Sequence, residues 1–110
     1  MSEEDLGSHE HYAEQLRSRA AAAALTGQDL RLAVLSAAAG ADVPEPYGAL
    51  VRQITEDSAR VTDGQVQAVR QSAGSDKAAF EVVLTAAIGA GLDRWDAAQQ
   101  AISEADDAAR

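Results

Sequence analysis

The chain has 110 residues, of which 46% are apolar but only 4% aromatic, and its formal net charge is −9 at pH 7. This length fits a single domain with a modest core, and the acidic charge argues against nucleic acid or an anionic membrane surface as a partner, because both attract basic proteins. The sequence has no apolar run long enough to cross a bilayer and begins with acidic residues, so we expect a cytoplasmic protein.

The start of the chain predicts a flexible acidic segment at residues 1–7, followed by a first helix. Ser8 is a suitable cap for this helix, which should run to about Leu25. The apolar residues have the spacing of an amphipathic helix and are Tyr12, Leu16, Ala20 and Ala23 or Ala24.

A second helix should begin where Thr26 and Asp29, three residues apart, resemble a capping box. Gly40 would end it, as glycine commonly ends helices. After it, the stretch AGADVPEP contains two prolines, which favour an extended connector. The buried face of this second helix would consist of Leu30, Ala33, Val34, Ala37 and Ala38.

The connector leads to a third helix and then, after a break at about residues 58–61, to a short fourth helix. The fourth helix should start with a capping box between Thr62 and Gln65 and end at Gly74. The third helix has a regular apolar stripe that consists of Tyr47, Leu50, Val51 and Ile54.

Ser75 is the expected cap of a fifth helix, the longest one, which should run to about residue 104 and leave a flexible tail at 105–110. No segment has the alternating pattern of a strand, so the sequence predicts an all-α bundle of about five helices in one domain, residues 8–104. The apolar stripe of the fifth helix consists of Phe80, Val83, Leu84, Ala87, Ile88, Gly91, Trp95, Ala98 and Ile102.

The predicted core is thin, because much of the apolar content is alanine, which buries little surface per side chain. Such a protein usually gains stability by burying further surface against another chain. We therefore expect a homo-oligomer, at least a dimer, or a complex with a partner protein. The fifth helix and Trp95 should lie at or next to the contact.

Gly89 and Gly91 lie inside the fifth helix, where each glycine costs about 0.5–1 kcal/mol relative to alanine. Close approach of another helix is the favoured explanation, and a ligand slot beside Gly91, between Ile88 and Trp95, is the alternative. Trp95 is interpreted as a core or interface anchor. Arg94 would join a salt-bridge network between helices or subunits, or else bind a carboxylate ligand.

Three further side chains are weak candidates for chemistry. Glu81 is a candidate general base, although Lys77, four residues earlier, favours an exposed ion pair instead. His9 and His11 point in different directions on a helix, and no further cluster of ligands is evident. We therefore predict no metal site and no cofactor.

Residues 61–98 combine Val61-Thr62-Asp63 at the start of a short helix, Gly74-Ser75-Asp76 at a turn, and Phe80-Glu81 in an apolar helix that ends at Arg94. This pattern resembles a helix pair of the carboxymuconolactone decarboxylase and alkylhydroperoxidase D-like superfamily. The resemblance implies an all-α fold that assembles as dimers, trimers or larger rings.

The redox members of that superfamily use a Cys-x-x-Cys pair with a nearby His and an upstream Glu. The chain has no cysteine, and the positions beyond Glu81 that would carry the pair hold Asp93 and Asp96. Thiol peroxidase activity is therefore excluded, because carboxylates neither form nor reduce a disulfide. The resemblance thus implies a non-catalytic or divergent relative.

The favoured function is that of a non-catalytic helical interaction protein or accessory subunit, which packs on copies of itself or on a partner protein. Two alternatives stay open. The first is a binding module for a small apolar or acidic molecule, lined by Tyr47, Arg94 and Trp95. The second is a cofactor-free enzyme of the decarboxylase type that uses Glu81 and a histidine.

Overall fold

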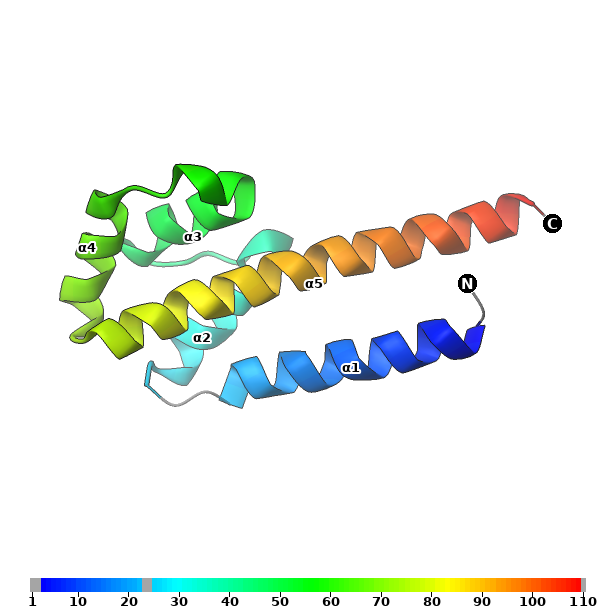
Figure 1. Cartoon of the computed structure of the whole chain (residues 1–110), viewed down its shortest axis with the longest axis horizontal. Helices are drawn as coiled ribbons and strands as arrows, with labels where there is room; N and C mark the ends of the chain where they lie inside the picture. The colour runs from blue at the N-terminus through cyan, green and yellow to red at the C-terminus, as the bar shows by residue number, and fades with distance from the viewer. Residues whose placement is uncertain (1–2, 23–24, 110) are drawn as a thin grey trace.

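The computed structural model describes residues 3–22 and 25–109, and within them the chain is helical without any strand (Figure 1). This confirms the all-α fold with a long C-terminal helix. The elements are α1 (Glu3–Ala22), α2 (Gln28–Leu35), the 3-10 turn η1 (Ala37–Ala39), α3 (Tyr47–Asp57), the 3-10 turn η2 (Ser58–Arg60), α4 (Asp63–Ala73) and α5 (Asp76–Ala108).

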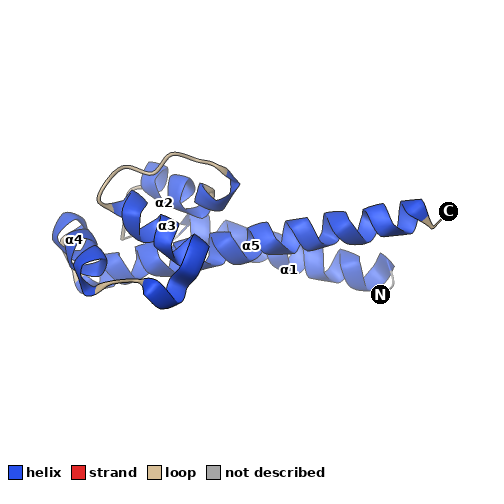
Figure 2. Ribbon diagram, turned by 90° about the horizontal axis from the view of Figure 1, so that it is seen from above, coloured by secondary structure: helices blue, strands red, loops and turns tan. Residues whose placement is uncertain are grey.

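The long helix α5 is the axis of the molecule, and each of the other helices contacts it. Helices α2, α3 and α4 surround its first half, whereas α1 runs antiparallel along it (Figures 1 and 2). The first half of α1 and the second half of α5 project together from this body as an arm. The radius of gyration is 15.8 Å, compared with about 13 Å for a compact chain of this length, so the molecule is elongated.

The core lies between α3 and the first half of α5, with α2 and α4 closing its sides. The α3 stripe is buried as the sequence predicts, with Leu50 and Val51 almost completely inaccessible. Tyr12 and Phe80, by contrast, are 66% and 65% exposed. The core is therefore built from small and aliphatic residues: Val34, Leu50, Val51, Ile54, Val69, Ala79, Val82 and Ala86.

The predicted boundaries of α4 and the predicted start of α5 are confirmed, whereas α5 continues to Ala108, past the expected end at about residue 104. Thr62 and Gln65 form the reciprocal capping box, with N–O distances of 3.1 and 3.0 Å. Gly74 adopts φ = 89°, a left-handed conformation that glycine takes without steric cost, and it ends α4. Ser75 then caps α5, because its hydroxyl accepts a hydrogen bond from the backbone N–H of Ala78 at 3.1 Å.

The predicted boundaries of the first two helices are wrong. Helix α1 begins at Glu3, so Ser8 lies inside it and is not its cap. Helix α2 begins at Gln28 after Gly27, without the expected Thr26–Asp29 capping box. It ends at Leu35, and Gly40 ends η1 instead. Ala23 and Ala24, expected on the stripe of the first helix, lie outside the described residues.

Arg31 provides the physical reason for the difference at the start of α2. Its guanidinium donates to the backbone carbonyl oxygens of Ala21, at 3.1 Å, and of Thr26. The turn between α1 and α2 is therefore held by a side chain from within α2, and the local capping pattern at Thr26 is not used.

Candidate interaction surface

Helix α5 carries two apolar faces. One is buried against α2, α3 and α4 and includes Ala79, Val82, Ala86 and Gly89. The other, which we call the outer seam, is exposed at every position. The outer seam consists of Phe80, Leu84, Ala87, Gly91, Arg94, Ala98, Ala101 and Ala105.

The spacing of the outer seam alternates strictly between four and three residues, which is the repeat of a helix that packs along a neighbouring helix. The apolar stripe predicted from the sequence mixed this seam with residues that pack within the chain. In the structure Val83, Ile88, Trp95 and Ile102 are half-buried, while the seam residues are exposed. Only Arg94 interrupts the apolar character of the seam.

A groove runs beside the outer seam, between α1 and α5. Its open volume is about 480 Å³, and two of the α1 side chains at its edge, Tyr12 and Leu16, are 66% and 42% exposed. We call the outer seam and this groove together the outer face. The groove is lined by Tyr12, Ala13, Leu16, Ala87, Ile88, Gly91 and Leu92.

The two glycines of α5 have different surroundings. A methyl group added at Gly89 would lie 2.3 Å from the carbonyl oxygen of Leu35, so this glycine is required for the close approach of α2. A methyl group added at Gly91 would have no neighbour within 4 Å. The prediction of a close helix is thus correct within the chain for Gly89, but Gly91 faces open space in the groove.

Trp95 connects α5 to α1. Its indole N–H donates to Glu10 Oε2 at 3.2 Å, and its ring meets the ring of His9 edge-on, with centroids 5.6 Å apart. Further along α1, Arg17 forms an ion pair of 3.4 Å with Asp96, the residue next to Trp95 on α5. These contacts hold the two helices of the arm together beside the outer face.

The three residues expected to line a small-molecule site do not converge. Arg94 Nη2 donates to the backbone carbonyl of Thr55 near the end of α3, at 3.0 Å. Tyr47 lies at the start of the same helix and packs against the core. Trp95 packs on α1, so the predicted site formed by these three residues is not present.

Glu81 is buried, with 8% of its surface exposed, and is not the exposed partner of Lys77 that the sequence predicts. Neither carboxylate oxygen has a hydrogen-bond partner in the described part of the chain. The sequence prediction failed because i, i+4 spacing does not report the orientation of the helix. His9 contacts Trp95, about four turns or 20 Å along α5 from Glu81, so these groups do not form one reactive site.

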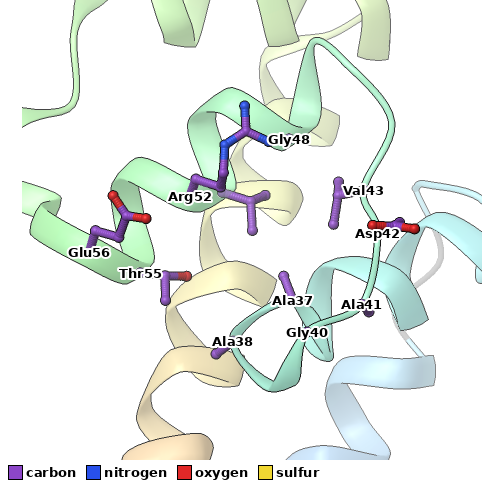
Figure 3. Close-up of a pocket in the computed structure, with 11 residues that line it drawn as sticks. Ala37, Ala38, Gly40, Ala41, Asp42, Val43, Gly48, Arg52, Thr55 and Glu56 are labelled. Carbon is purple, nitrogen blue, oxygen red and sulfur yellow. The ribbon is translucent and has the colours of Figure 1, made fainter.

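A second hollow, of about 370 Å³, lies between α3 and the connector at residues 40–43 (Figure 3). Arg52, Thr55 and Glu56 of α3 lie along one side, and Ala37 and Ala38 lie at its floor.

The one guanidinium at this hollow is already paired. Arg52 binds Glu45 at 2.9 Å, and Glu45 also accepts the backbone N–H of Ala49 at 3.0 Å. These two contacts hold the pKa of Glu45 below its usual range. The sequence analysis missed this hollow, although Gly48 was a signal: an added methyl group there would meet the Val43 carbonyl oxygen at 2.7 Å.

No helix among the described residues is sufficiently long and apolar to cross a membrane. Within the same part of the chain, no three His, Asp or Glu side chains are grouped so that they could hold a metal ion. His11 contacts only its neighbour Tyr12 among the aromatic rings described, with centroids 6.2 Å apart.

No family model, curated protein or solved structure matches the chain. The resemblance of residues 61–98 to the carboxymuconolactone decarboxylase and alkylhydroperoxidase D-like superfamily is therefore not supported by a family match. The class that the fold defines is a small all-helical protein, and its long helix α5 carries an exposed, mostly apolar seam.

Proposed function

We propose that this chain is a non-catalytic helical interaction protein that self-associates through its outer face. The observation that carries the proposal is the outer seam, which keeps the spacing of a helix-packing interface for eight positions while all of them are exposed. If this face contacted only water, the large apolar side chains of Phe80 and Leu84 would stay exposed.

The size of the apolar surface supports association. Tyr12, Leu16, Phe80 and Leu84 are each between 42% and 66% exposed. Full burial of a completely exposed side chain of this size stabilises by about 1.5–3 kcal/mol, so each of these half-exposed side chains could still gain about half of that. A two-fold interface uses each residue twice, which brings the gain to the same order as the roughly 4–15 kcal/mol that association costs.

The alternatives have less support. The buried Glu81 and the exposed histidines are separated along the molecule, which argues against a decarboxylase-type site. The superfamily resemblance of residues 61–98 stays part of the proposal, because it also implies a helical protein that assembles from several copies. An apolar ligand in the α1–α5 groove would occupy the same surface as the second copy.

Substitution of Leu84 tests this proposal. Leu84→Glu places a charge in the outer seam and should shift the protein from oligomer to monomer, while the helical content stays unchanged. The matched control is Leu32→Glu, because Leu32 is similarly exposed, at 42%, but lies on α2 outside the outer face. Sedimentation velocity at micromolar concentration measures both variants.

The control variant should sediment like the wild type. The proposal is wrong if Leu84→Glu and the wild type sediment identically, or if Leu32→Glu dissociates the protein equally well.

A further inference from the structure

We propose that the second copy lies antiparallel on the first, with the α5 helices of the two chains in contact along their outer seams. This inference rests on the self-association proposed above and adds the orientation and register of the contact. In this register Phe80 of one copy packs on Ala105 of the other, and Leu84 packs on Ala101.

The distribution of side-chain size along the outer seam favours this arrangement. The large residues, Phe80 and Leu84, lie at the N-terminal end of α5, whereas Ala98, Ala101 and Ala105 occupy the C-terminal end. Antiparallel pairing places large against small along the whole contact, as a well-packed interface requires. Parallel pairing would crowd the aromatic end and leave the alanine end loosely packed.

The centre of the seam also favours the antiparallel orientation. In the proposed register, Arg94 of each copy lies over Gly91 of the other. Gly91 has open space beside it, with nothing within 4 Å of an added methyl group, so it leaves room for the aliphatic stem of Arg94, whose guanidinium binds the Thr55 carbonyl of its own chain. Parallel pairing would instead place Arg94 directly opposite a second Arg94, and like charges repel.

The charges at the two ends of α5 are complementary in the same orientation. Lys77, the single lysine of the chain, lies in the first turn of α5, where the helix dipole adds a partial positive charge. Asp76 in the same turn is paired with Arg70 at 2.6 Å, so the positive charge of Lys77 is not cancelled by it. Glu104, Asp106 and Asp107 lie in its last turns and are exposed. Antiparallel pairing brings the acidic end of one copy to the basic end of the other, whereas parallel pairing would gather six carboxylates at one end.

The absence of cysteine makes the register measurable, because any cysteine introduced is the only thiol. Ala87→Cys and Ala98→Cys face each other across the proposed contact. An oxidised mixture of these two variants should give a disulfide-linked dimer containing one copy of each. Ala87→Cys alone should not cross-link, since its two thiols would lie about 16 Å apart.

A spin-label distance provides a second measurement that does not require a disulfide. A nitroxide attached to Ala105→Cys should give an inter-copy distance of about 40 Å in the antiparallel dimer, compared with about 10 Å in a parallel one. Circular dichroism confirms that each variant keeps the helical fold.

The outcomes separate this inference from the proposed function. Efficient cross-linking of Ala87→Cys alone, with a spin-label distance near 10 Å, would establish parallel pairing and overturn the inference while self-association stands. A dimer that gives neither the mixed cross-link nor the long distance uses another surface, which also overturns it. A monomeric wild type would overturn both proposals.

Discussion

Glu81 places a carboxylate inside the protein without a hydrogen-bond partner for either oxygen among the described residues. Its buried neighbour Thr85 does not help, because the Thr85 hydroxyl donates to the backbone carbonyl of Glu81, at 2.7 Å. A buried polar group without a partner lowers the free energy of unfolding, because it loses its hydrogen bonds to water and forms none within the protein. Glu81 therefore destabilises the fold of the isolated chain.

We expect Glu81→Leu to raise the free energy of unfolding by about 1–3 kcal/mol, because leucine has a similar volume and needs no hydrogen bond. Urea denaturation followed by circular dichroism measures the change. Glu56→Leu, on the exposed side of α3, is the control and should change it by less than about 0.5 kcal/mol. Destabilisation by Glu81→Leu would mean that the carboxylate is paired in solution.

At the scale of helices, the crossing of α2 and α5 depends on Gly89. Helix α2 is only 8 residues long, and the carbonyl of its last residue, Leu35, lies directly on the α5 backbone. Gly91, two residues further on, lines the groove, and a methyl group added there would have no neighbour within 4 Å. A side chain is therefore excluded at Gly89 but has room at Gly91.

Alanine at these two positions should change stability in opposite directions. Gly89→Ala should destabilise by about 1–3 kcal/mol, because the new methyl group overlaps the Leu35 carbonyl. Gly91→Ala should stabilise the chain by up to about 1 kcal/mol through better helix propensity. Thermal unfolding of the two variants at equal concentration compares them. Equal melting temperatures would contradict the assigned crossing.

The sequence predicted helix ends correctly where a capping residue or a glycine lies next to the end itself. Thr62 with Gln65, Gly74 and Ser75 act locally, so both ends of α4 and the start of α5 followed from neighbouring residues. The end of α5 carries no such signal, and the helix continues to Ala108 instead of ending at about residue 104. The turn between α1 and α2 depends on Arg31, which reaches backbone carbonyls across the turn. That contact exists only after the helices pack, so local patterns could not reveal it.

The candidate surface was predicted only in part, because its composition also depends on how the helices pack. Periodicity identified an apolar stripe on the fifth helix that includes Gly91 and Trp95. It did not show which members face the chain's own core, because two apolar faces overlap on an alanine-rich helix. The burial of Glu81 and the separation of Tyr47 from Trp95 depend on how the helices rotate and cross.

At the scale of the whole molecule, the notable feature is the two-helix arm. The chain extends over 54 × 26 × 21 Å, and its long dimension follows α5 (Figures 1 and 2). Two helices alone cannot enclose a core, so the arm is held by side contacts such as Trp95 to Glu10. In the antiparallel register proposed above, the arm of each copy lies along the first half of α5 of the other. The α1 and α5 helices of the two copies would then complete a four-helix bundle, in which apolar side chains are enclosed on all sides.

The most direct test of self-association is the molar mass of the wild-type chain in solution. Size-exclusion chromatography with light scattering at micromolar concentration should give at least twice the 11.4 kDa of one chain. The apparent mass should fall on dilution as the outer faces separate. A mass of 11.4 kDa that stays constant over the whole concentration range would contradict the account.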